Sequence, residues 1–126
     1  DVNFQSVSRS GNTVSVTFNN TAAQDTSITQ ARMSFYFNEQ QPGGQDEVDP
    51  YDIRNATTVF GDDLLIGEPM QTLDPQPSLP GNNTETTISF EFDQDGSSDN
   101  LAQRDFFVVD LRFENGARGT YFVDVP

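Results

Sequence analysis

Residues 105–124 read DFFVVDLRFENGARGTYFVD, and this stretch decides the fold class. Apolar residues alternate with other residues on both sides of Asn115-Gly116, which is the period of a β-strand with one face on a core. Asn-Gly between two alternating runs is a strong hairpin signal, because a type I′ turn requires positive φ at both central residues. We therefore predict a hairpin that pairs residues 107–114 with residues 118–125.

The same period of two recurs along the rest of the chain, at residues 2–4, 14–18, 33–37 and 88–92. Polar residues fill the alternate positions, as in antiparallel sheets that have one face on the core and one face exposed to solvent. About seven to nine such strands predict a single domain, residues 1–126, with an all-β fold. The expected architecture is a two-sheet antiparallel sandwich, immunoglobulin-like but without the Cys and Trp hallmarks, and a small barrel is the alternative. Residues 67–81 carry four prolines, which favour an edge or crossover segment there.

Phenylalanine is expected to form most of the core, because the chain has eleven Phe, no Trp and no Cys. The residues assigned to the core are Phe18, Phe35, Phe37, Phe90, Phe92, Phe107, Val109, Leu111 and Phe113. The chain also has no His, so catalytic triads with an imidazole base and zinc sites with His or Cys ligands are excluded.

The charge composition is the second informative feature. All six cationic residues are arginines, the chain has twenty Asp and Glu residues, and the formal net charge is −14. Such a charge destabilises a compact state unless salt screens it, and the Debye length falls from about 8 Å at physiological salt to about 3 Å at 1 M. The composition therefore predicts a halophilic protein, with an ordinary acidic extracellular or calcium-binding domain as the alternative. Binding of nucleic acid is disfavoured, because this surface would repel phosphates.

One acidic run is a candidate calcium site. Residues 93–99 place Asp93, Asp95 and Asp99 around a glycine, and calcium prefers such oxygen ligands. The twelfth position of the run is Arg104 rather than a bidentate Glu, so a solvated acidic turn is the competing interpretation. Weaker candidates are the cluster Asp46, Glu47, Asp49 and Asp52 and the pair Asp62-Asp63. Calcium is the one cofactor considered, and since no carboxylate pair stands out as a glycosidase pair, we expect a protein that is not an enzyme.

Three Asn-x-Thr triplets begin at Asn19, Asn55 and Asn82, at expected turns or strand ends where a glycan has room. A chain rich in Asn and Thr also produces such triplets by chance. No apolar stretch approaches eighteen residues, so this chain is not expected to contact the membrane itself. Its start on a strand-like pattern predicts that a signal peptide or anchor preceded it, and we expect an extracellular, cell-surface location.

Four segments carry a resemblance to a known family. They are NTVSVTFNNT at residues 12–21, the run at 28–37 that ends in SFYF, LPGNNT at 79–84 and DFFVVDLRFENG at 105–116. They are similar in strand rhythm and composition to immunoglobulin-like sandwich domains of haloarchaeal surface proteins, including the globular domains of type IV pilin-like and archaellin-like filament subunits. The resemblance implies a non-enzymatic structural subunit or adhesive module of a pilus-like filament, whose partners are copies of itself or other cell-surface proteins.

Type IV pilins also carry a long apolar N-terminal helix, and this sequence has none. Either that helix was removed or assembly uses another route, such as donation of residues 2–7, with Val2, Phe4 and Val7, as a strand to the open sheet edge of a neighbour. The competing function is a secreted or surface-anchored binding module for carbohydrate or another surface protein. It would need exposed aromatic rings, and the amphipathic rings available are Tyr36, Tyr51 and Tyr121.

Overall fold

The computed structural model describes residues 1–36, 50–55, 57–92, 101 and 105–126, and these residues form ten β-strands. In chain order the strands are β1 (Val2–Ser10), β2 (Thr13–Asn20), β3 (Thr26–Tyr36), β4 (Tyr51–Arg54), β5 (Val59–Leu64), β6 (Gln71–Thr72), β7 (Ser78–Leu79), β8 (Thr84–Phe92), β9 (Phe106–Phe113) and β10 (Arg118–Asp124). The expected number of strands was too low, because four short strands, β4 to β7, lie in a region without a clear period of two. In the part of the chain that is described, no helix is long and apolar enough to span a membrane.

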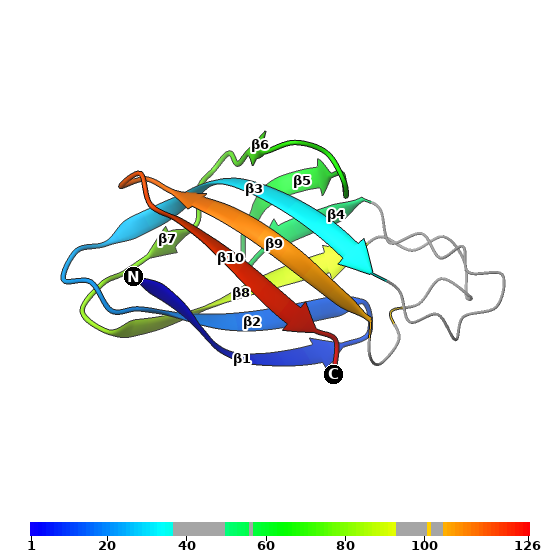
Figure 1. Ribbon diagram of the computed structural model, residues 1–126, viewed down its shortest axis with the longest axis horizontal. Coiled ribbons are helices and arrows are strands. Elements are labelled where there is room, and N and C mark those ends of the chain that lie inside the picture. The colour runs from blue at the N-terminus through cyan, green and yellow to red at the C-terminus, as the bar shows by residue number, and fades with distance from the viewer. Residues whose placement is uncertain (37–49, 56, 93–100, 102–104) are drawn as a thin grey trace, which may run out of the picture.

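The strands form two antiparallel sheets that pack face to face (Figure 1). Sheet I has the order β1-β2-β8-β4-β5, and sheet II has the order β10-β9-β3-β6, with β7 also paired to β3. This order matches strands A, B, E and D in one sheet and G, F and C in the other sheet of an immunoglobulin constant-type domain. The predicted all-β sandwich is confirmed, and β6 and β7 lie at an edge, as the prolines around them require.

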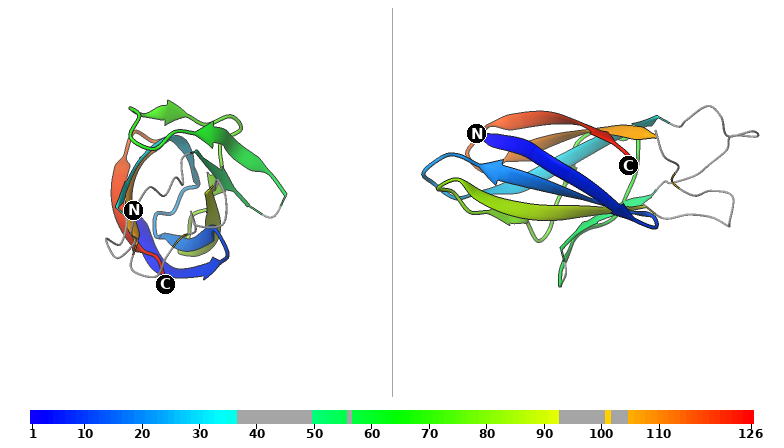
Figure 2. Two further views of the ribbon diagram at one scale, coloured as in Figure 1. Left: turned by 90° about the vertical axis from the view of Figure 1, so that its right-hand side faces the viewer. Right: turned by 90° about the horizontal axis from the view of Figure 1, so that it is seen from below.

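The inward side chains of both sheets form one apolar core. Seen end-on, the strands of the two sheets are arranged around the long axis of the molecule (Figure 2). Phe107 lies near its centre, with ring centroids 5.4 Å from both Phe90 and Phe92. Of the residues assigned to the core, those that are buried are Phe18, Phe90, Phe92, Phe107, Val109, Leu111 and Phe113. Phe35 is only partly buried; it packs against the core and is the second-last residue of β3. Phe37 lies outside the described residues.

The β9–β10 hairpin is confirmed, but its turn is not the expected type I′. Arg112 pairs with Arg118, which leaves a three-residue loop within the closing pair Phe113–Ala117. In this loop Gly116 alone has positive φ, and its N–H donates to the Phe113 carbonyl at 2.9 Å. These are the features of a type I turn followed by a left-handed glycine, which is the other common hairpin loop that tolerates Asn-Gly.

Candidate assembly site

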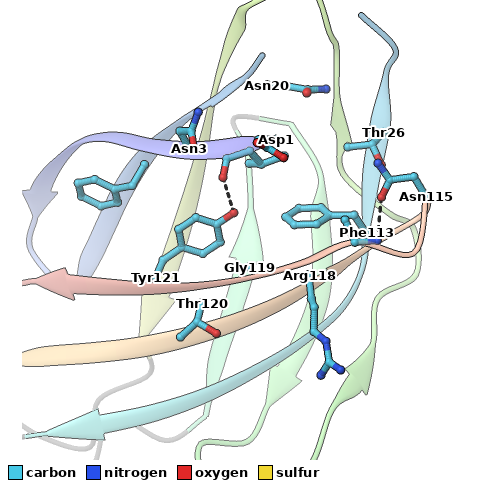
Figure 3. Close-up of a pocket in the computed structure, with 13 residues that line it drawn as sticks. Asp1, Asn3, Asn20, Thr26, Phe113, Asn115, Arg118, Gly119, Thr120 and Tyr121 are labelled. Atoms are coloured by element: carbon cyan, nitrogen blue, oxygen red, sulfur yellow. Dashed lines mark hydrogen bonds between the residues drawn. The ribbon is translucent and has the colours of Figure 1, made fainter. Parts of the chain in front are cut away.

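The first and last strands lie side by side at an open edge of the sandwich. β1 is an edge strand of sheet I, β10 is an edge strand of sheet II, and both run in the same direction (Figure 1). A groove of about 370 Å³ lies between their first halves, and the β9–β10 turn closes one end of it (Figure 3). Within the described part of the chain, no strand pairs with the outer edge of either β1 or β10.

Tyr121 bridges the two edge strands across this groove. Its hydroxyl donates to the Val2 carbonyl at 2.7 Å (Figure 3). Its ring meets the ring of Phe18 edge-on at a centroid distance of 5.0 Å. The ring lies over Gly119, where an added Cβ would collide with the Tyr121 hydroxyl. Burial raises the pKa of the Tyr121 hydroxyl to about 12, so this hydroxyl remains a donor at neutral pH.

The free edge of β10 has a definite set of backbone groups. The closing pair Phe113–Ala117 is hydrogen-bonded, and so is the pair Asp105–Val125, in which the Val125 N–H donates at 2.8 Å. Antiparallel pairs alternate between bonded and non-bonded residues, so every second residue of β10 directs its N–H and C=O away from β9. The outward residues are Arg118, Thr120, Phe122 and Asp124.

The same alternation applies to β1. The Thr21 N–H donates to the Asp1 carbonyl at 2.9 Å, so Val2, the next residue, directs its backbone groups away from β2. Phe4 follows with the same direction, and beyond a bulge Val7 does so as well. These are the three residues proposed from the sequence for strand donation, and the structure places them in β1, paired with β2 of their own chain. Their insertion into a neighbour stays a prediction.

The three candidate glycosylation sites differ in accessibility. Asn19 is nearly buried, and its Nδ2, the atom to which a glycan is attached, donates to Asn83 Oδ1 at 2.7 Å. Asn55 and Asn82 are exposed. The Oδ1 of Asn55 accepts hydrogen bonds from the N–H groups of Thr57 and Thr58, each at 2.9 Å, which leaves its nitrogen directed to solvent. Asn55 and Asn82 therefore offer more room for a glycan than Asn19, and occupancy stays a prediction for all three.

The candidate calcium ligands Asp93, Asp95 and Asp99 lie outside the described residues, as do Asp46, Glu47 and Asp49. The structure instead brings together carboxylates that sequence reasoning had placed in separate groups. The carboxylate oxygens of Asp52, Asp62 and Asp63 lie within 4.8 Å of one another, and the Asp63 N–H donates to Asp52 Oδ1 at 2.8 Å. The pairing of β4 with β5 and its bulges produce this grouping, and neither is visible in the sequence.

No protein-family model matches this chain, and a search of the curated proteins gives no match.

We expect Tyr121→Phe to loosen the start of β1 and to cost about 1 kcal/mol of stability, because the bond from its hydroxyl to the Val2 carbonyl is lost. The Thr21 amide, which donates to Asp1, should then exchange faster with deuterium, as measured by NMR. Tyr36→Phe removes an exposed hydroxyl instead and is the control. Equal Thr21 exchange in the two variants would show that Tyr121 does not hold β1.

Proposed function

We propose that this protein is a non-enzymatic structural subunit or adhesive module of an extracellular, pilus-like filament of a haloarchaeal cell, and that it assembles through the open edge formed by β1 and β10. The observation that carries this proposal is the free outer edge of β10, with outward backbone groups at four alternate residues. An unpaired edge of this kind is a template for a strand from another chain.

The two edge strands differ in how well they are protected. Soluble proteins commonly guard sheet edges with lysine, proline or bulges. The chain has no lysine and neither edge strand contains proline, so the strands differ in bulges alone, and the pairing of β10 with β9 is regular over all seven residues. β1 has a bulge between Phe4 and Ser6, which interrupts its register. The observations therefore favour β10 as the strand that accepts a neighbour.

The charge of the chain fits assembly in concentrated salt. With a net charge of −14, copies repel one another at low ionic strength. At molar salt the Debye length is about 3 Å, so strands of two copies can approach to pairing distance with little repulsion. This supports a role at a surface that is bathed in brine.

A binding module for carbohydrate or another surface protein is the second candidate. It is favoured by exposed aromatic rings on the outer face of sheet II, where Tyr36 stacks on Phe106 at 4.7 Å and Phe122 is 70% exposed. Tyr51 and Tyr121 are buried and do not contribute to such a surface. We place this function second because exposed aromatic rings serve equally as contacts between copies.

Blocking the edge of β10 tests the proposal. Thr120→Pro removes an outward N–H and no hydrogen bond to the backbone of β9. Thr120→Val keeps that N–H and is the control. Both variants lose the hydrogen bond from the Thr120 hydroxyl to Asp110. In molar NaCl we expect the wild type and Thr120→Val to form large assemblies, and Thr120→Pro to remain monomeric. Sedimentation velocity and electron microscopy measure this, and thermal melts confirm that each variant is folded.

Two outcomes would contradict the proposal. If Thr120→Pro assembles as well as Thr120→Val, the β10 edge is not the contact. If the wild type stays monomeric at high protein concentration in molar NaCl, the filament function fails and the binding module takes its place.

A further inference from the structure

Three of the six arginines gather on the outer face of sheet II. Arg32 of β3, Arg112 of β9 and Arg118 of β10 are all exposed, and we call them the arginine face. They line a hollow of about 180 Å³ together with Asp110 and Thr120. A concentration of cations on one face is unexpected in a chain with a net charge of −14.

The register places two of these cations opposite each other. Arg112 and Arg118 are direct cross-strand partners, and they form a non-bonded pair because the neighbouring pair Phe113–Ala117 is hydrogen-bonded. Side chains approach most closely in such pairs, and like charges placed opposite each other are destabilising. The fold therefore places two like charges opposite each other, and a carboxylate from another molecule would offset their repulsion.

Among the described residues, no carboxylate forms an ion pair with the arginine face. The ion pairs found among the described residues join Arg54 to Asp52 and to Glu91, both away from the arginine face. Asp110 lies opposite Arg32 in the register and lines the same hollow, so one carboxylate lies among the three guanidinium groups, and its Oδ1 accepts the Thr120 hydroxyl at 2.6 Å. The guanidinium groups of the arginine face are thus available to a carboxylate on another molecule.

Apolar surface continues from the arginine face along the same strands. The register of β3, β9 and β10 places two rows of cross-strand neighbours on this outer face. One row is Tyr36, Phe106 and Asp124, and the other is Ser34, Val108 and Phe122. Phe122 and Tyr36 are 70% and 48% exposed. Apolar contact persists in concentrated salt while long-range attraction between charges is screened, so a contact that combines both kinds of surface suits brine.

We propose that the arginine face binds carboxylates of a second copy of this chain, as one half of the repeating contact in the filament. This inference rests on the proposed function. Charge complementarity favours a second copy as the ligand of this face, because each copy carries twenty Asp and Glu residues. The planar guanidinium group of arginine binds a carboxylate through two parallel hydrogen bonds.

The counterpart that we assign is the corner formed by Asp52, Asp62 and Asp63, whose carboxylate oxygens lie within 4.8 Å of one another. Asp52 also pairs with Arg54 of its own chain at 4.0 Å, so Asp62 is the residue chosen for the test of this corner. It belongs to β4 and β5 of sheet I, whereas the arginine face belongs to sheet II. The contact therefore joins two different surfaces of identical chains. Such a heterologous contact lets subunits add one after another. If the rotation between neighbouring subunits does not close a ring, the product is a filament.

A charge-matched pair of variants tests the face. Arg112→Gln/Arg118→Gln and Ala23→Glu/Gln24→Glu each lower the net charge by two, and the second pair lies in the exposed turn between β2 and β3. We expect the first variant to need at least a tenfold higher protein concentration for half-assembly in molar NaCl, and the second to assemble like the wild type. Light scattering against protein concentration gives these midpoints, and melting curves confirm folding.

A charge swap tests the counterpart. Arg112→Glu/Arg118→Glu and Asp62→Arg should each assemble poorly alone, and an equimolar mixture should recover assembly, because the reversed face of one variant then meets the reversed corner of the other.

The outcomes separate the inference from the function on which it rests. Wild-type assembly that is unaffected by Arg112→Gln/Arg118→Gln overturns the inference and leaves the filament function in place. A wild type that never assembles removes both. If the wild type assembles regardless of the arginines but loses binding to polygalacturonate in the arginine variant, the face binds an acidic polysaccharide and not a second copy.

Discussion

Phe107→Ala should lower the free energy of unfolding by about 3–5 kcal/mol, as is usual when a buried phenyl ring is removed. Phe107 is fully buried and its ring contacts those of Phe35, Phe90 and Phe92, with centroid distances of 5.3–6.1 Å across this ring cluster. It therefore joins β3 and β9 of sheet II to β8 of sheet I. Urea titration at constant molar NaCl measures the loss, because urea leaves the ionic strength unchanged.

Phe122→Ala is the matched control for this prediction, because the same ring is removed from a position that is 70% exposed. Its effect on the stability of the monomer should be within about 0.5 kcal/mol. Both variants are best compared at protein concentrations below assembly, since Phe122 lies on the surface proposed to contact a second copy. Similar losses in the two variants would mean that the sheets do not pack through the Phe107 cluster.

Dilution of salt from molar to tens of millimolar should lower the melting temperature by more than about 10 °C, which corresponds to a few kcal/mol for a domain of this size. The cause is repulsion within a chain of net charge −14, whose described ion pairs involve Arg54 alone. Circular dichroism melts over a series of NaCl concentrations measure the effect.

Sucrose at low salt is the control for this prediction, because it strengthens apolar burial without screening charge. If sucrose restores the melting temperature as fully as NaCl does, weakened burial rather than repulsion limits stability at low salt. A melting temperature that does not change across the salt series would remove the inference of a halophilic protein.

Much of the fold was predictable because β2, β8, β9 and β10 each place apolar residues at alternate positions, and this pattern follows directly from the geometry of a strand with one buried face. The strands β4 to β7 could not be predicted in the same way. They have two to six residues each, and bulges interrupt the pairing of β4 with β5, so no run is long enough to show a period.

The candidate assembly site was predictable in part. The sequence predicted that residues 2–7 form a strand that could be donated to a neighbour; the structure shows that they belong to an edge strand, and the donation stays a prediction. The bond from Tyr121 to Val2 and the arginine face were not foreseen, because both depend on which strands become neighbours and in which register. Arg32 and Arg112, for example, are far apart in the chain and meet only because β3 pairs with β9.

The central strand pairs of both sheets join residues that are far apart in the chain, and this bears on how the chain folds. The contact between Thr17 of β2 and Thr87 of β8 joins residues 70 positions apart, and that between Thr29 of β3 and Arg112 of β9 joins residues 83 positions apart. The entropy of closing such long loops is lost before the strand pairs stabilise the chain, so sandwiches of this kind fold in milliseconds to seconds. The hairpins β1–β2 and β9–β10 close over a few residues, so we expect them to form first. Until β8 and β3 join them, their apolar faces remain open to other chains, and the same strands that we propose for ordered assembly are then exposed to disordered aggregation.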